Sequence, residues 1–460
     1  MNKQVRIVYF ITLLMFSQSV FSQKLNLFDL LGTLERDLPY LNAKEAENAS
    51  QLHKVSSART EYLPSLTIGH QYNYGTSNNV EGSLFPNEGT VISPSGGIHP
   101  SSHTAGVFGS YTSAAVDYKL VNFGKTSAYV DLARKEAEIS SADYRNEHFQ
   151  YKLLLSRSYI HFLISQRVRQ AQEVNYNRSN TFYLVIKAKA EAGLRPGADT
   201  SIARAELIKA QLLLLNAQRE ENGAWLALRE LVPLLNDSVS IDTMNIFHKV
   251  PEPLLKEETL LSNTPLSVYY NSVINAHMAR ENFIKRSFLP SIILSGAVWA
   301  RGSGISNKTN EYQTTFSNGT RYQVFNYLAG ISIRWNLLSM TKLTHDLKSQ
   351  QYLTEKNKNL YQHQLLKQDK KLKDAQQQLQ LSLLQTSLAP VQYSAALNAL
   401  QQSEARYASG LADIATYYQS LISANNALLD FYITYATSWQ SLLSLAESTG
   451  DFSVFTDQIK

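Results

Sequence analysis

Two histidines, His99 and His103, come closest to a metal-binding pattern in this sequence. Zinc sites in proteins take three or four ligands at recurring spacings. This pair has no third ligand at a suitable spacing and lies in a stretch rich in Ser, Gly and Pro. We therefore expect solvated imidazoles and no bound metal.

The residue patterns of common enzymes are also missing. The sequence contains no phosphate-binding loop, no His-Glu-x-x-His and no Gly-x-Ser-x-Gly. It contains no cysteine, which rules out a cysteine nucleophile, a disulfide framework and lipid attachment at an N-terminal cysteine. We expect a protein that is not an enzyme and works without a cofactor.

Composition and charge are those of a folded protein that does not bind nucleic acid. The formal net charge is +5, with 44% hydrophobic and 18% charged residues. So small and evenly spread a charge does not favour binding to nucleic acid. The 26 tyrosines outnumber the 18 phenylalanines. Tyrosine suits places where one end of the side chain is apolar and the other is wet, such as membrane interfaces.

The N-terminal segment is expected to be a secretory signal peptide. Lys3 and Arg6 supply its positive start, and residues 7–16 form its apolar run. Val20-Phe21-Ser22 fits the cleavage pattern, so the mature chain would begin at Gln23. A membrane-spanning helix needs about 20 apolar residues, and no later segment reaches that length. We expect no helical membrane span.

One arrangement of motifs occurs twice along the chain. Leu-Pro-Ser surrounds Pro64 and again Pro290, and Gly-Leu begins at Gly193 and again at Gly410. In each copy a helical pattern precedes Leu-Pro-Ser, two alternating segments follow it, and a very long helical pattern leads to Gly-Leu. Self-similarity of this size indicates a duplicated structural unit.

The duplication divides the sequence into five segments. The signal peptide covers residues 1–22, the first repeat 23–234 and the second repeat 263–447. A proline-containing connector, residues 235–262, separates the repeats. The tail, residues 448–460, has no strong pattern and is expected to be disordered.

Alternation of apolar and polar residues predicts two strands in each repeat. The segment from 291 to 301 is also strand-like, but its faces are less distinct. The apolar faces of the other three carry Leu66, Ile68, Tyr72 and Tyr74, then Phe108, Ala114, Val116, Tyr118 and Leu120, then Phe325, Tyr327, Ile331, Ile333 and Trp335.

An ordinary half-buried antiparallel sheet would show the same alternation. Three features favour membrane strands instead. The runs have the length of about ten residues that a tilted strand needs to cross a bilayer. Aromatic residues lie near the ends of the apolar faces, and the polar faces carry Gly, Ser, Asn and Gln. Four strands cannot enclose an interior, so several chains would have to share one barrel.

A very long helix is expected after each strand pair. The stretch 125–192 contains neither Pro nor Gly, enough for a helix about 100 Å long. The second one is expected to run unbroken from Met340 to Ala389 and to continue past Pro390 to Ser409. Its leucines follow coiled-coil spacing in two runs, which indicates a narrow apolar stripe. Leu353 and Leu360 are seven residues apart, and so are, in a second run, Leu365, Leu372 and Leu379.

Each long helix is followed by a second one of clear apolar content. In the first repeat its apolar residues include Ile202, Leu207, Leu212 and Leu215. A solvent-exposed coiled coil without a channel would explain one such hairpin. Two hairpins, each attached to a strand pair, favour a helical tube that continues a strand barrel.

In the order and spacing of these pieces, the chain resembles the TolC-like outer-membrane efflux protein family over roughly residues 25 to 445. The resemblance rests on several short motifs besides the two Leu-Pro-Ser strand entries. They are Val121-Asn122-Phe123-Gly124, Ala192-Gly193-Leu194 followed by Ala203-Arg204-Ala205, and Arg406-Tyr407 followed by Ser409-Gly410-Leu411.

The resemblance implies a mainly α fold with a membrane β-barrel part. In it, a homotrimer builds a twelve-strand β-barrel among outer-membrane lipid, which continues into a twelve-helix α-barrel in the periplasm. Such a channel is the passive exit duct of a tripartite efflux pump or type I secretion system. Its partners would be a periplasmic adaptor (membrane fusion) protein and an inner-membrane pump or exporter. The tips Gly193-Leu194 and Gly410-Leu411 match adaptor-contacting positions of the family.

The resemblance also implies gate residues near the tips. A tyrosine three residues before the second glycine and an aspartate six after the first correspond to Tyr407 and Asp199. These could form a hydrogen-bonded latch, or Asp199 could be solvated beside a packed Tyr407. The acidic residue of the narrowest ring matches Gln419, and an arginine of some members matches Ala412. A ring of neutral amides would not concentrate cations. Asp413 or Arg195 could substitute for the missing charge, but the sequence does not place either of them in the lumen.

A soluble periplasmic coiled-coil adaptor or structural protein is the alternative function. It too would be exported and would contain long helical hairpins. An adaptor usually has one hairpin, whereas this chain has two, each preceded by an aromatic-rich strand pair.

Overall fold

A computed structural model describes residues 26–76, 78, 101–233, 246–252, 261–306 and 308–459. The expected signal peptide and most of the connector lie outside these residues. The chain divides into two compact units, one of residues 1–50, 138–273 and 357–460, and one of residues 51–137 and 274–356. In the described part of the chain, no helix has the length and apolar character of a membrane span.

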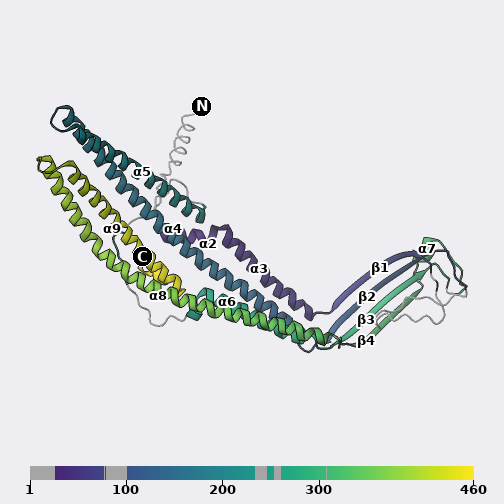
Figure 1. The fold of residues 1–460 in the computed structure, drawn as a ribbon. Helices are drawn as coiled ribbons and strands as arrows, with labels where there is room; N and C mark the ends of the chain where they lie inside the picture. Colours follow the sequence, from purple (N-terminus) through teal and green to yellow (C-terminus); the bar gives the residue numbers. More distant parts are fainter. Residues whose placement is uncertain are drawn as a thin grey trace, which may run out of the picture. The chain divides into compact units, whose positions relative to one another are not determined.

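The second unit contains one antiparallel sheet of four strands in the order β1-β2-β3-β4 (Figure 1). The strands are β1 (Ser65–Gly75), β2 (Val107–Val121), β3 (Ser291–Ser303) and β4 (Val324–Arg334). The central β2–β3 pairing joins the strand pairs of the two repeats. Among the described residues, β1 and β4 have no further strand beside them, so both outer edges are free.

The strand register separates an apolar face of the sheet from a polar one. Ile68 lies opposite Ala114, Ala114 opposite Val298, and Val298 opposite Tyr327. The opposite face carries the adjacent residues of the same strands, which are Ser113, Trp299 and Asn326. This face is polar except at Trp299. On the apolar face, Ile68 is 72% and Tyr327 84% exposed. The expected alternation is confirmed. At one end of the apolar face, Phe316 packs against Tyr72 and Phe108, with ring centroids 5.5 Å and 5.3 Å apart, whereas no described residue covers Ile68 or Tyr327 to that extent.

Strands β1 and β3 each begin directly after a proline, as the sequence predicts. Helix α3 (Pro39–Arg59) and the short helix η1 (Thr60–Tyr62) end before Pro64, and α6 (Pro265–Ser287) ends before Pro290. Proline has no amide hydrogen and cannot continue a helix, whereas its fixed φ is compatible with an extended chain. The short helix α7 (Phe316–Thr320) lies between β3 and β4.

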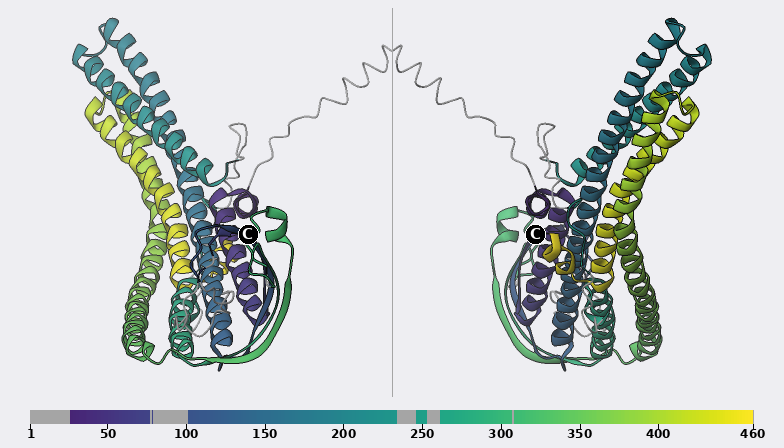
Figure 2. Two further views of the ribbon diagram at one scale, coloured as in Figure 1. Left: turned by 90° about the vertical axis from the view of Figure 1, so that its right-hand side faces the viewer. Right: turned by 90° about the vertical axis from the view of Figure 1, so that its left-hand side faces the viewer.

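The first unit is helical and holds most of two antiparallel hairpins, which lie side by side there (Figure 2). The first pairs α4 (Lys125–Glu191) with α5 (Gly197–Leu231), and the second pairs α8 (Ser339–Ala408) with α9 (Ile414–Thr449). Helix α4 has 67 residues, a length of about 100 Å. Helix α8 continues through Pro390, as expected.

The residues that α5 buries differ from the expected ones. A stripe of alanines every seven residues packs inside the chain, namely Ala203, Ala210, Ala217 and Ala224. Of the expected apolar residues, Ile202 is 40%, Leu212 57% and Leu215 53% exposed. Small side chains let helices approach closely, so the alanine stripe forms the contact and the larger side chains remain uncovered.

Helix α8 shows the same kind of difference. Leu379 of the expected heptad stripe is buried, but Leu353 and Leu360 are 41% and 42% exposed. The buried positions nearby are Gln350, Thr354 and Gln368. Hydrogen bonds make this polar burial possible, since the Gln368 amide donates to Thr264 Oγ1 over 2.9 Å.

The main core of the helical unit includes the C-terminal tail. Trp439 of α9 is fully buried, and its indole nitrogen donates to the Ile246 carbonyl over 3.0 Å. Phe455 packs edge-on against Trp439, with ring centroids 6.3 Å apart. Phe455 belongs to α10 (Ser453–Ile459), so the expected disorder of the tail was wrong. The N-terminal α2 (Leu27–Asp37) adds four buried leucines to this core.

Candidate functional site

The two hairpin tips are built by the same turn. Gly193 has φ +73° and Gly410 has φ +75°, a left-handed conformation that only glycine adopts at low cost. After each glycine, the next amide reaches back over the helix end: Leu194 to the Lys189 carbonyl at 2.9 Å, and Leu411 to the Arg406 carbonyl at 2.8 Å. This Schellman turn ends both long helices.

The turn leaves one leucine of each tip in solvent. Leu194 is 73% and Leu411 71% exposed. Leucines uncovered at equivalent places in both hairpins form two similar apolar contact points. The structure therefore presents the four predicted tip residues, Gly193, Leu194, Gly410 and Leu411, at the ends of the hairpins.

Gly193→Ala is expected to destabilise the chain by about 1–2 kcal/mol, because an L-residue is strained at this φ. Gly223→Ala, within α5, should stabilise it by about 0.5–1 kcal/mol through helix propensity. At both positions an added Cβ meets no atom within 4 Å, so the two substitutions differ in backbone conformation and not in space. Helix melting followed by circular dichroism would measure both. Equal shifts would contradict the turn assignment.

Arg195 of the first tip contacts the second hairpin. Its guanidinium lies over the Tyr407 ring, with 4.7 Å from Cζ to the ring centroid. One of its nitrogens, Nη2, donates to the Tyr407 carbonyl over 3.0 Å. Because this carbonyl belongs to the last turn of α8, the positive charge also meets the negative end of the helix dipole. Three favourable interactions thus converge on one side chain.

An aromatic cluster lies beneath this contact, and we call it the tip cluster. It consists of Phe182 from α4, Tyr407 from α8, and Tyr417 and Tyr418 from α9. Phe182 stacks on Tyr417 with centroids 4.1 Å apart, and its edge meets Tyr418 at 5.4 Å. Burial raises the pKa of Tyr417 to about 12. The cluster therefore stays uncharged at any physiological pH and holds the two hairpins together.

Tyr407 and Asp199 approach each other, but no hydrogen bond joins them in the described chain. Tyr407 is 3% exposed, and its hydroxyl has no partner among the described residues. Burial raises the pKa of Tyr407, while Arg195 lowers it and the nearby Asp199 raises it. Asp199 is half-buried in the first turn of α5. The latch between these two residues remains a prediction.

Gln419, the third predicted gate residue, is exposed on α9. It lies apart from the buried side of this helix, where its neighbours Tyr417 and Tyr418 pack into the tip cluster. Asp413 begins α9, and its carboxylate accepts the Thr416 amide over 2.8 Å. This hydrogen bonding lowers the pKa of Asp413, which keeps the helix cap charged.

The arrangement offers packing, hydrogen bonding and charge, without a constellation for metal chemistry. Among the described residues, no group of three His, Asp or Glu side chains could hold a metal ion. Of the two histidines considered above, His99 lies outside the described residues. His103 packs against Tyr312 with ring centroids 4.6 Å apart.

Sequence reasoning did not assign Arg195 its part in the tip. A basic residue two positions after the helix-ending glycine was visible, but its partner lies 212 residues later. The sequence feature that could have indicated this role is Gly-Leu-Arg-Pro at residues 193–196, since this turn places a cation next to a helix end.

Residues 30–232 match the protein-family model described as outer membrane efflux protein. A comparison with curated protein sequences gives no match.

Solved outer-membrane channels have a similar fold over nearly the whole chain. CmeC of Campylobacter jejuni has a TM-score of 0.73 at 14% identity, covering 92% of this chain and 85% of CmeC. VceC of Vibrio cholerae has 0.73 at 15%, covering 92% and 96%. The open state of MtrE of Neisseria gonorrhoeae has 0.73 at 15%, covering 94% and 90%. At such identities the likeness concerns the fold.

Proposed function

Since residues 30–232 identify this chain as an outer membrane efflux protein, as its sequence motifs implied, we propose that it is the exit duct of a tripartite efflux pump or type I secretion system. Its location is the outer membrane, with an extension into the periplasm. It would be a passive conduit, with the energy for transport supplied by an inner-membrane pump or exporter. The observation that carries this proposal is a sheet whose apolar face is exposed over most of its length, in one chain with two long helical hairpins.

The free edges of the sheet support a barrel shared between three chains. Unpaired strand edges are unfavourable unless they are covered or closed. If β4 of one chain pairs with β1 of the next, three sheets close into twelve strands and no edge remains. The apolar face, with Ile68 and Tyr327 as examples, would then face lipid, and the polar face would line the pore.

The uncovered apolar residues of α5 support the same trimer. Ile208, Leu212 and Leu215 lie at helical spacing on one side of α5 and are 48%, 57% and 53% exposed. Such a row of exposed side chains marks an interaction surface. A neighbouring chain would cover it when six hairpins assemble into a twelve-helix tube.

The tips would dock to a periplasmic adaptor protein. Leu194 and Leu411 offer two similar apolar contact points per chain, so a trimer would present six. Apolar side chains that become buried at the centre of an interface contribute much of its affinity. The adaptor would in turn connect the duct to the inner-membrane pump.

The tips would also hold the closed state, with Tyr407, Asp199 and Gln419 as the gate residues. The buried, unpartnered hydroxyl of Tyr407 beside Asp199 supports a latch that forms only when the trimer closes. A buried polar group without a partner is unfavourable, which favours its pairing in some state of the protein.

Tyr407→Phe removes this hydroxyl and little else. With a latch present, we expect leakier channels, with conductance in planar bilayers and entry of large antibiotics both increased severalfold. Tyr418→Phe is the control, since its hydroxyl is likewise buried and unpartnered but is not implied as a gate. Unchanged conductance and drug susceptibility for Tyr407→Phe would exclude the latch.

Fractionation of cells tests the function as a whole. The channel should sediment with outer membranes, resist extraction by salt and form conducting trimers in planar bilayers after detergent purification. A soluble periplasmic adaptor, the alternative, would be released by salt and would not conduct. Loss of drug efflux on deletion of the gene, restored by the intact chain, would complete the evidence.

A further inference from the structure

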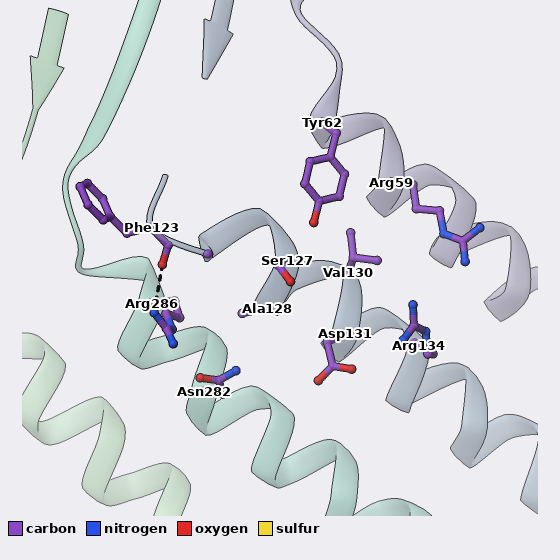
Figure 3. Close-up of a pocket in the computed structure, with 11 residues that line it drawn as sticks. Arg59, Tyr62, Phe123, Ser127, Ala128, Val130, Asp131, Arg134, Asn282 and Arg286 are labelled. Atoms are coloured by element: carbon purple, nitrogen blue, oxygen red, sulfur yellow. Dashed lines mark hydrogen bonds between the residues drawn. The ribbon is translucent and has the colours of Figure 1, made fainter. Parts of the chain in front are cut away.

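A pocket of about 640 Å³ opens where the strands give way to helices (Figure 3). Its walls come from the end of α3, the turn between β2 and α4, the start of α4 and the end of α6. All of these belong to the unit that contains the sheet. The polar side chains that line it include Arg59, Arg134, Arg286, Asp131 and Asn282.

The lining is positively charged, with three arginines against one aspartate. Figure 3 shows Arg59 and Arg134 on one side, Arg286 on the opposite side, and the carboxylate of Asp131 between them. Arg286 donates to the Phe123 carbonyl over 3.2 Å. Within the described chain, Arg59 and Arg134 form no ion pair or side-chain hydrogen bond, and both are exposed. Two guanidinium groups are therefore available to an anion.

The turn beside the pocket has an unusual backbone. Phe123 has φ 49°, which is uncommon for a residue other than glycine. The Arg286 hydrogen bond to its carbonyl holds this conformation, and the Phe123 side chain remains 47% exposed. Strained conformations of this kind are found where a ligand or partner is bound.

Exposed aromatic and aliphatic side chains lie at the same end of the sheet as this pocket. They lie just before β1 or just after β2 and β4, and they are Tyr62, Leu63, Phe123, Trp335, Leu337 and Leu338. Aromatic residues at the boundary between a membrane segment and a wet segment are typical of the headgroup level of a bilayer. On the proposed function, this level is the periplasmic leaflet of the outer membrane.

We propose that this pocket binds the headgroup of a phospholipid of the periplasmic leaflet, of the type that carries both a phosphate and an ammonium group. Guanidinium groups bind phosphate oxygens by paired hydrogen bonds, which suits Arg59, Arg134 and Arg286. Asp131 would accept the ammonium group, and the Tyr62 hydroxyl, which points into the pocket, would donate to the phosphate (Figure 3). The inference rests on the proposed membrane location.

Native mass spectrometry of the trimer in detergent tests the proposal with three lipids. We expect phosphatidylethanolamine to bind more tightly than phosphatidylcholine, whose quaternary ammonium cannot donate hydrogen bonds. The double variant Arg59→Gln/Arg134→Gln should lose at least about tenfold in affinity, because charge-assisted hydrogen bonds are the stronger ones. Asp131→Asn should weaken phosphatidylethanolamine and leave phosphatidylglycerol unchanged or tighter. Lys285→Gln, next to Arg286 but outside the pocket, is the matched control.

The outcomes separate this proposal from the proposed function. A double variant that conducts normally but keeps the wild-type lipid affinity overturns the lipid site alone. Displacement of lipid by inorganic phosphate as effectively as by phosphatidylethanolamine would identify a free-anion site and overturn it too. If the double variant loses its trimers but keeps its lipid binding, the pocket is a contact between copies of the chain, and the lipid site is overturned. Failure of the wild type to sediment with outer membranes would instead contradict the proposed function.

Discussion

Ile331→Arg is expected to keep the chain from assembling in the outer membrane. Ile331 lies on the apolar face of β4 and is 68% exposed. Arginine on the lipid face of a membrane barrel costs about 2–4 kcal/mol near the bilayer midplane. A trimer would carry this cost three times, so we expect trimers in the outer membrane to fall at least tenfold, as measured by fractionation and unheated gel electrophoresis.

The next residue of the same strand is the matched control. Ser332 alternates with Ile331 and lies on the polar face, opposite Ile293 of β3. If that face lines a wet pore, Ser332→Arg places its charge in water, and assembly should be close to normal. Equal loss in both variants would mean that the sheet is an ordinary buried one, and equal tolerance would mean that its apolar face does not meet lipid.

Those features of the fold that depend on local sequence were predictable. The proline-marked strand entries, the period of two in β1, β2 and β4, and the glycines of the tips follow from backbone sterics, which act within a few residues. The structure places each of them as expected, at Pro64 and Pro290 and at Gly193 and Gly410.

Contacts between segments far apart in the sequence were harder to predict. The apolar pattern of α5 predicted buried leucines, but the alanine stripe is what packs within the chain. Periodicity shows which residues prefer burial and does not tell whether the same chain or a neighbouring one covers them. The short α10 was missed for a related reason, since its helix depends on tertiary burial of Phe455 more than on its own sequence.

In the candidate site, too, local features were predictable and contacts between hairpins were not. The positions of Asp199, Tyr407 and Gln419 near the tips followed from their spacing to Gly193 and Gly410. The role of Arg195 did not, because it depends on the approach of two hairpins that the sequence alone cannot orient. The tip cluster was invisible for the same reason, as Phe182 stacks on a residue of another hairpin.

Arg195→Ala is expected to loosen the tips and open the duct. The change removes a charge-assisted hydrogen bond and a cation–π contact, interactions worth roughly 1–3 kcal/mol together at a half-buried site. It also removes one of the cations near the end of α8, where Arg406 of the last turn remains. If the closed state depends on this contact in all three chains, conductance and antibiotic sensitivity should rise at least about tenfold, since each 1.4 kcal/mol changes an equilibrium tenfold.

Two variants show which part of Arg195 matters. Arg195→Lys keeps the charge but lacks the planar guanidinium, so it should give an intermediate conductance. Arg204→Ala removes an exposed arginine from the same hairpin without touching Tyr407, and it should behave like the wild type. Because the tip cluster remains in every variant, the hairpins should stay folded, with helix content unchanged by circular dichroism. Wild-type conductance in Arg195→Ala would show that the tips are held closed without this contact.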